Sequence, residues 1–334
     1  MWAATGRTPT EKNKQREELH IMTTLYLVVP CYNEQEVLPE SSKRFLQKLH
    51  SLIQSGRISD ESRVLFVDDG SKDTTWQQIE DYHAEDAHIL GLKLSRNRGH
   101  QNALLAGLMT AKEYADCVVS LDADLQDDIN AVDEMLTRFE EGCDVVYGVR
   151  ESREKDTFFK RFTAQGFYRL MQAMGTQVVY NHADYRLMSK RALDALAEFR
   201  EVNLFLRGMV PLVGYKFATV SYVREERFAG ESKYPLKKML AFAFDGITSF
   251  SVKPLSLITG VGFVIFVLSI LAAIYALISY LLGYAVSGWT STIVSLWFLG
   301  GVQLICLGIV GQYIGKIYSE VKQRPRFIIE KFLK

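Results

Sequence analysis

Two aspartates, Asp122 and Asp124, follow the apolar run Cys117–Leu121 and are separated by a single residue. If this run is a strand, side chains two residues apart share a face, and Gln126 extends the row. Carboxylate and amide oxygens are the ligands that hard cations such as Mg²⁺ and Mn²⁺ take, together with substrate phosphates. The spacing therefore indicates a divalent-metal site facing a diphosphate. A solvated loop of acids that caps the next helix is the competing interpretation.

Two other polar segments follow apolar runs. Residues Pro30–Glu34 bring a ring and a carboxylate, those of Tyr32 and Glu34, to a position where a nucleoside could stack and be hydrogen-bonded. Residues Asp68–Ser71 add two carboxylates suited to a ribose or a base edge, and the glycine among them permits a tight turn. Each segment alone is also compatible with an ordinary turn. Their occurrence in order, each after an apolar run, favours one composite binding site.

The elements that position these residues are short apolar runs alternating with longer amphipathic stretches. We expect strands at Leu25–Pro30, Arg63–Asp68, Ile89–Leu94, Cys117–Leu121 and Asp144–Val149, and helices at Glu36–Ser55, Asp73–Glu85, Gln101–Ala115 and Asn130–Glu141, with Asp73 and Asn130 as N-caps. This alternation predicts an α/β fold with a mostly parallel sheet and helices on both faces. Ligands bind at the carboxyl ends of such strands, where the three segments fall. No G-x-G-x-x-G follows the first strand, which argues against a dinucleotide-binding dehydrogenase.

A charge-free stretch lies near the end of the chain. Residues 254–315 contain no Asp, Glu, Lys or Arg, and ~20 apolar residues suffice to cross a bilayer. A break at 283–289 predicts two transmembrane helices at about 255–282 and 290–315. Lysines and arginines flank the outer ends of both spans, whereas the connecting loop is uncharged. The positive-inside rule then places both termini and the large N-terminal domain in the cytoplasm. A buried hairpin in a soluble protein is the alternative.

The rest of the chain divides by composition. We expect a disordered polar lead-in at 1–22, a catalytic domain at 23–233, an interfacial amphipathic helix at 234–253 and a cytoplasmic basic tail at 316–334. The four cysteines are far apart and form no C-x-x-C pair, which indicates a reducing compartment. The 39 basic and 39 acidic residues balance, so no nucleic-acid partner is expected.

Four segments taken together resemble the signature of a known family. Pro30–Glu34, Val67–Ser71, Asp122–Asp127 and Gly230–Tyr234 look like the motifs of family 2 polyprenyl-phosphate glycosyltransferases. The resemblance covers about residues 24–330 and is strongest to the bactoprenol glucosyltransferases, which are similar to dolichyl-phosphate mannose synthases. It implies a GT-A fold, a divalent metal (Mg²⁺ or Mn²⁺) and inversion at the sugar carbon.

The resemblance also implies roles for individual residues. The nucleoside would be held by Pro30, Tyr32, Glu34, Asp68 and Asp69, and the metal with its diphosphate by Asp122, Asp124 and Gln126. Basic residues near the donor phosphates would be Arg150, Arg227 and Lys233.

A second set of residues would serve the acceptor. Asp184 matches an aspartate proposed to orient or deprotonate the acceptor, so Asp124 and Asp184 are the predicted catalytic residues. A cap of a helix or turn is the other interpretation of Asp184. Arg161 and Arg186 are the predicted ligands of the acceptor phosphate, although Arg186 could equally be a salt-bridge partner of Asp184.

The predicted reaction moves a hexose from a nucleotide-sugar to undecaprenyl or another polyprenyl phosphate at the bacterial inner membrane, and the resemblance favours UDP-glucose as donor. The second pKa of a phosphate monoester is near 6, so the acceptor needs little help from a base. GDP-mannose or a UDP-linked aminoarabinose donor, a processive polysaccharide synthase and a catalytically silent scaffold remain alternatives. The sequence contains no Gln-x-x-Arg-Trp motif, the acceptor motif that processive synthases usually need, which argues against that alternative. A homo-oligomer is permitted by the small residues of the second span, Gly300, Gly301, Gly308 and Gly311.

Overall fold

The five predicted strands all form. The computed structural model describes residues 22–150, 182–202, 204–223, 253–282 and 288–334. Within them the strands are β1 (Leu25–Cys31), β2 (Arg63–Asp68), β3 (Ile89–Leu94), β4 (Cys117–Ser120) and β5 (Val145–Arg150). No boundary differs from the prediction by more than one residue, because polar residues end each apolar run abruptly.

The four predicted helices also form, as α2 (Leu38–Gln54), α3 (Thr75–Glu85), α4 (His100–Ala111) and α5 (Ala131–Glu140). Asn130 occupies the N-cap of α5, but its side chain makes no capping hydrogen bond. The N-cap of α3 is Thr74, so the prediction of Asp73 was wrong by one residue. The Asp73 carboxylate nevertheless accepts a hydrogen bond from the backbone N–H of Thr75, at 3.0 Å.

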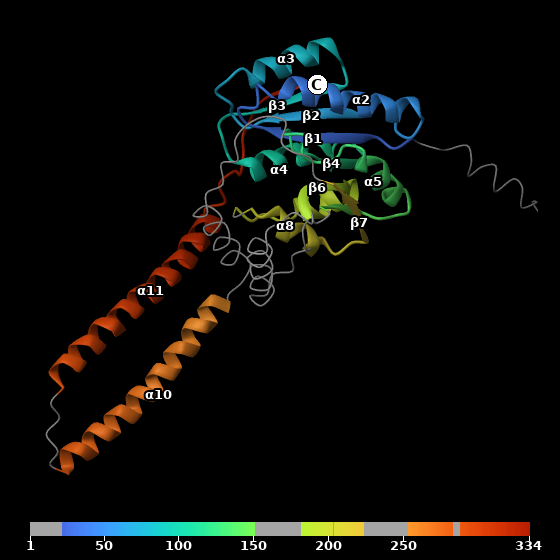
Figure 1. The fold of residues 1–334 in the computed structure, drawn as a ribbon. Helices are drawn as coiled ribbons and strands as arrows, with labels where there is room; N and C mark the ends of the chain where they lie inside the picture. Colours follow the sequence, from blue (N-terminus) through green and yellow to red (C-terminus); the bar gives the residue numbers. More distant parts are fainter. Residues whose placement is uncertain (1–21, 151–181, 203, 224–252, 283–287) are drawn as a thin grey trace, which may run out of the picture.

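All strands belong to one mixed sheet, in the order β7-β5-β6-β4-β1-β2-β3-β8 (Figure 1). Strands β3, β2, β1 and β4 are parallel neighbours and form the parallel part of the sheet that the α/β alternation predicts. Strand β6 (His182–Ser189) runs antiparallel between β4 and β5, and β7 (Phe217–Tyr222) pairs parallel with β5 at the edge. The insertion of β6 beside β4 brings residues from the later part of the chain to the Asp122 loop.

Helices cover both faces of this sheet, so that two apolar layers form. Helices α2 and α5 pack on one face of the sheet. Helices α4 and α7 (Lys190–Ala197) pack on the other face, together with α8 (Leu206–Met209) and the 3-10 helix η1 (Val210–Val213). Helix α4 lies especially close to the sheet. A Cβ atom at Gly107 would stand 2.4 Å from Val28 and 2.7 Å from Val67. The second half of α4 is therefore packed directly against β1 and β2. All four cysteines are free.

The C-terminal part leaves this domain and returns to it. Helix α10 (Lys253–Leu281) contacts α11 (Trp289–Val321), and both extend away from the sheet in Figure 1. Strand β8 (Ile329–Leu333) then pairs antiparallel with β3. The predicted basic tail is thus in part a strand of the sheet, and its residues Phe332 and Leu333 pack against the two apolar layers. The hairpin consequently begins and ends on the side of the catalytic domain.

Segment Phe298–Val321 of α11 is long and apolar enough to span a membrane, and among the residues searched it alone meets that criterion. Helix α10 contributes a shorter apolar segment, Pro254–Ile265. Two spans at about 255–282 and 290–315 therefore stay a prediction, although helices occupy both ranges. The lead-in at 1–21 and most of the predicted interfacial segment lie outside the described residues.

Candidate active site

The loops after β1 and β2 are fastened to each other by hydrogen bonds. The backbone N–H of Asn33 donates to Ser71 Oγ at 3.0 Å, and the Asn33 Oδ1 atom accepts from the N–H of Lys72 at 2.9 Å. Tyr32, next to Asn33, is 41% exposed, so its ring is accessible for stacking against a base. Pro30, in contrast, is buried within β1 opposite Val67, so it shapes the strand end rather than presenting a surface.

Asp68 and Asp69 end β2 but differ in what they bind. The Oδ1 atom of Asp68 accepts from the N–H of Ser71 at 3.1 Å, while its buried Oδ2 atom has no hydrogen-bond partner among the described residues. Both oxygens of Asp69 accept backbone N–H groups, from Arg98 at 2.7 Å and Gly99 at 2.8 Å. Burial raises the pKa of both carboxyl groups. Asp68 therefore offers an acceptor to a ligand, whereas Asp69 holds the loop that leads into α4.

Gly70 is required where these loops meet. Its φ of +67° is in the left-handed region, and a Cβ atom there would stand 2.6 Å from backbone atoms of Arg96 and Asn97. The turn that sequence reasoning expected at this glycine is confirmed, with the loop after β3 as its close neighbour.

The Asp122 segment shows the predicted alternation. Leu121, Ala123 and Leu125 are buried in the core. The residues between and after them, Asp122, Asp124 and Gln126, are half-buried and form the polar row. The Gln126 N–H donates to Asp124 Oδ1 at 3.2 Å, and Leu125 has a φ of +57° that bends the chain here. The row therefore presents several oxygens at the carboxyl end of β4, a donor set that fits Mg²⁺ or Mn²⁺.

His100, the first residue of α4, lies near three acids that come from different parts of the sheet, Asp69, Asp122 and Asp184. Sequence reasoning missed this histidine. Its Nε2 atom is 3.6 Å from Asp122 Oδ1 and 3.9 Å from Asp184 Oδ2. It also lowers the pKa of Asp69, partly offsetting burial. Burial raises the pKa of Asp122, and His100 is the largest influence in the opposite direction. Inspection of the residues after the third strand, which the strand-end rule called for, would have found it.

Asp184, on β6, lies between two arginines. Arg186 Nη2 is 2.8 Å from Asp184 Oδ1, and Arg207 Nη2 is 3.1 Å from Asp184 Oδ2. Burial opposes ionisation of Asp184, but the two guanidinium groups outweigh it and hold the pKa of this carboxyl well below its usual range. Arg186 is only 1% exposed, which favours the salt-bridge interpretation over contact with a lipid phosphate. Arg207, 42% exposed, is the more accessible cation, and no sequence motif had marked it.

Arg150 lies near the Asp122 segment, with its Nη2 atom 3.7 Å from Asp127 Oδ1. Its Nε donates to the hydroxyl of Tyr222 at 3.1 Å, and that hydroxyl donates to Asp127 Oδ1 at 2.5 Å. Burial, followed by the charge of Asp122, raises the pKa of Asp127 to about 6. Arg150 in turn lowers the pKa of Asp122 electrostatically.

Of the predicted site residues, the structure therefore brings together Asp122, Asp184 and Asp69 around His100, and Arg150 acts electrostatically on Asp122. Glu34 is fixed by its own N–H, which donates to Thr75 Oγ1 at 2.9 Å and ties it to the start of α3. The predicted phosphate ligands Arg161, Arg227 and Lys233 lie outside the described residues.

Comparisons with known proteins agree with this architecture. The family model described as glycosyl transferase family 2 matches residues 26–197. The chain is 56% identical to glycosyltransferase YkoT of Bacillus subtilis over 92% of its length and 91% of the relative's. It is 40% identical to the SfII prophage-derived bactoprenol glucosyl transferase of Shigella flexneri, over 91% of this chain and 97% of the relative. The solved mannosyltransferase PcManGT from Pyrobaculum calidifontis, in complex with GDP-Man and Mn²⁺, covers 88% of each chain at 15% identity and a TM-score of 0.45.

The family model spans half of the chain, and both curated relatives are more than 30% identical over nearly the whole of it. The parallel part of the sheet, with helices on both faces, is what the α/β alternation predicted. The chain belongs to glycosyl transferase family 2.

Proposed function

We propose that this glycosyltransferase moves glucose from UDP-glucose onto undecaprenyl phosphate or a similar polyprenyl phosphate, at the cytoplasmic face of the bacterial inner membrane. The observation that carries the proposal is the position of His100, within 4 Å of both Asp122 and Asp184. The first of these acids belongs to the predicted donor site and the second to the predicted acceptor site. The 40% identity to a bactoprenol glucosyl transferase supports the choice of sugar and lipid.

The donor half of the site would bind the nucleotide. The exposed ring of Tyr32 is suited to stack on the base, and the buried Oδ2 of Asp68, which has no hydrogen-bond partner among the described residues, to accept a hydrogen bond from the base or ribose. Asp69 positions the loop that carries His100 by accepting two backbone N–H groups. These contacts would orient the anomeric carbon of the sugar toward the acceptor. Part of the entropic cost of aligning the two reactants is then met when the donor binds.

Asp122, Asp124 and Gln126 would hold a divalent cation, Mg²⁺ or Mn²⁺. Their fit rests on the half-buried row of oxygens and on the raised pKa of Asp122, which burial causes and which a cation would relieve. A bound cation supplies positive charge to the diphosphate leaving group. Arg150 lies next to the same row and adds a fixed positive charge there.

The acceptor half would orient a phosphate. In the proposed step a phosphate oxygen forms a bond to the anomeric carbon, the bond from that carbon to the nucleoside diphosphate breaks, and the configuration inverts. Asp184 is held ionised, but its low pKa makes it a weak proton acceptor, so we assign it the positioning of Arg207. The exposed guanidinium of Arg207 would then meet the acceptor phosphate. A dianionic phosphate needs no base.

The membrane part would bring the lipid to this site. Because α10 leaves the catalytic domain and α11 returns to it through β8, the hairpin has both of its ends on one side. Basic residues at these ends favour the cytoplasmic side.

The test is an assay with a panel of UDP- and GDP-sugars. Purified full-length protein in detergent, with Mg²⁺ or Mn²⁺, should release UDP from UDP-glucose only when polyprenyl phosphate is present, and should yield a lipid carrying one sugar. Release of the nucleotide from GDP-mannose alone, or from UDP-aminoarabinose alone, would identify that nucleotide-sugar as the donor in place of UDP-glucose. A growing glycan would favour a processive synthase, and release that does not depend on the lipid would contradict the acceptor assignment.

A further inference from the structure

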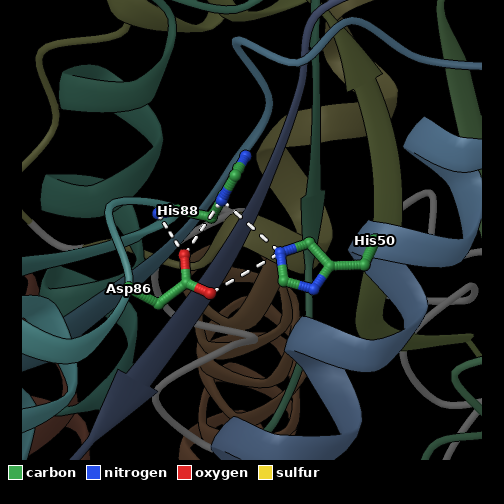
Figure 2. A group of neighbouring side chains, drawn as sticks. All are labelled: His50, Asp86 and His88. Carbon is green, nitrogen blue, oxygen red and sulfur yellow. Dashed lines mark hydrogen bonds and ion pairs between the residues drawn. The ribbon is translucent and has the colours of Figure 1, made fainter.

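Two histidines and an aspartate converge at a place remote from the acids just described. His50 lies near the end of α2, Asp86 is the C-cap residue of α3, and His88 precedes β3 (Figure 2). The strands β2 and β3 start beside them, at Arg63 and Ile89. The cluster is therefore at the amino-terminal edge of the parallel strands, whereas the proposed donor site is at their carboxyl ends. The proposed sugar transfer does not involve these three side chains.

The three residues can each offer one ligand atom, and these atoms all lie within 4.8 Å of one another. His50 Nε2 is 3.4 Å from His88 Nδ1 and 3.6 Å from Asp86 Oδ2, while the other Asp86 oxygen, Oδ1, is 2.9 Å from His88 Nδ1. For metal–ligand bonds of about 2.0–2.1 Å, tetrahedral geometry separates ligand atoms by about 3.4 Å. The two histidine nitrogens already have that separation, and a small rotation of the Asp86 carboxylate would bring one of its oxygens into the third position.

We propose that His50, Asp86 and His88 form a second metal site, for a divalent transition ion such as Zn²⁺. Two imidazoles with one carboxylate suit Zn²⁺ and its neighbours, whereas Mg²⁺ takes oxygen ligands. The three side chains are 37%, 24% and 21% exposed, so an ion can reach them and water can take the fourth position. Binding replaces the hydrogen bond between His88 Nδ1 and Asp86 by two bonds to the metal, and the single proton of the neutral imidazole is then carried on Nε2 instead of Nδ1.

A carboxylate beside the second nitrogen of His88 adds support. His88 Nε2 is inaccessible to solvent and has no hydrogen-bond partner among the described residues, while Asp60 Oδ1 is 3.4 Å from it. Metal-binding histidines commonly donate their other ring N–H to such a carboxylate, which fixes the tautomer. A small rotation of the 84% exposed Asp60 side chain would complete that bond.

The ion would join elements that are distant in the sequence. It would connect the end of α2 to the turn between α3 and β3, and Asp60 would add the loop before β2. The expected consequence is a stabilised edge of the domain, with no direct part in sugar transfer. The cluster without an ion, held by hydrogen bonds alone, is the alternative to be tested.

The experiment is a Zn²⁺ titration of the full-length protein in detergent, freed of any polyhistidine tag and stripped with a chelator. Excess Mg²⁺ occupies the Asp122 row, so that Zn²⁺ binding there is suppressed. Calorimetry reports stoichiometry and affinity, and Co²⁺ in place of Zn²⁺ reports tetrahedral geometry through its visible absorption. The variants are His50→Gln, His88→Gln and Asp60→Asn. His83→Gln is the control, because this histidine is on α3 but bonds to the carbonyl of Ile89 outside the cluster.

We expect one Zn²⁺ per wild-type chain and a thermal midpoint that rises by several degrees. His50→Gln and His88→Gln should each weaken binding at least about 100-fold, and Asp60→Asn about tenfold. His83→Gln should bind as the wild type does, and transferase activity with Mg²⁺ should be unchanged in His50→Gln, which shows that it is folded. Absence of Zn²⁺ binding in the wild type, or binding by His50→Gln and His88→Gln that is as tight as in the wild type, would overturn the proposal.

Discussion

The Nε2 atom of His100 lies 3.6 Å from Oδ1 of Asp122, although the two residues belong to loops after different strands. The relationship depends on Asp69, which accepts the N–H of Gly99 and so fixes the residue before His100. An acid that follows β2 thereby helps to fix the position of a side chain beside Asp122. The two halves of the proposed donor site are coupled through one loop.

The coupling can be tested with His100→Gln. The substitution removes the imidazole that lies between the carboxylates of Asp122 and Asp184, so their mutual repulsion is less well offset. We expect kcat/KM to fall roughly tenfold, about 1.4 kcal/mol, with little change in stability, since His100 is 44% exposed. Initial rates with saturating lipid measure the effect, and His83→Gln is the control. Equal rates for His100→Gln and the wild type would remove His100 from the site.

Asp184→Asn should destabilise the protein. Arg186 is fully buried, and its ion pair with Asp184 supplies the charge that makes this burial tolerable. Loss of one partner of such a pair costs about 3 kcal/mol. A lowered thermal midpoint in detergent is the expected result. A midpoint equal to that of the wild type would mean that the pair is not maintained in solution.

Ionisation of Asp184 should also make no contribution to the pH dependence of the transfer rate near neutrality. Its folded-state pKa is lowered, against burial, by Arg186 and Arg207, and the unfolded value is about 3.9. The stabilisation is therefore complete above that value and is lost only as the pH falls through the lower folded pKa. Between about pH 5 and 8 the rate should follow the second pKa of the acceptor phosphate, near 6. If the residual activity of Asp184→Asn loses this acidic limb, Asp184 is a base after all.

Arg207→Ala tests the acceptor phosphate. If its guanidinium meets that phosphate in the bound state, the substitution should raise KM for polyprenyl phosphate roughly tenfold and change KM for UDP-glucose little. Arg138, on the exposed side of α5 with Glu134 and Glu141, is the matched control. A rise in the donor KM instead would assign Arg207 to the donor.

The strand β8 should contribute to the stability of the catalytic domain. Ending the chain after Arg326 removes β8 from the edge of β3 together with the apolar contacts of Phe332 and Leu333. We expect a loss of about 2–4 kcal/mol, read as a lower thermal midpoint. Lys331→Ala is the control. It breaks only an exposed ion pair with Glu80, and such pairs contribute less than about 1 kcal/mol. A midpoint unchanged by the truncation would show that β8 is dispensable.

Sequence reasoning was accurate where a residue's environment follows from its neighbours in the chain. Apolar runs ending in polar residues fixed the bounds of β1 to β5, and the two-residue period placed Asp122 and Asp124 on one face. The resemblance to a family supplied the roles, and the family itself is confirmed.

Contacts between distant segments could not be predicted in that way. Arg207 meets Asp184 only because α8 packs against β6, and β8 joins the sheet from beyond the second helix of the hairpin. Five residues that include Glu330 and Lys331 resemble a charged tail in the sequence, and only the available edge of β3 makes them a strand. Arg186 was ambiguous in sequence because burial, which decides between ion pair and ligand, is a property of the whole fold.

The most direct test of the account is UDP binding measured with and without Mn²⁺ in the wild type, in Asp124→Asn and in Asp68→Asn. If the strand-end acids hold a cation and a nucleotide together, Mn²⁺ should strengthen UDP binding by the wild type but not by Asp124→Asn, which should also lose turnover. Asp68→Asn should bind UDP weakly in either condition. Undiminished turnover and Mn²⁺-enhanced binding in Asp124→Asn would contradict the central claim.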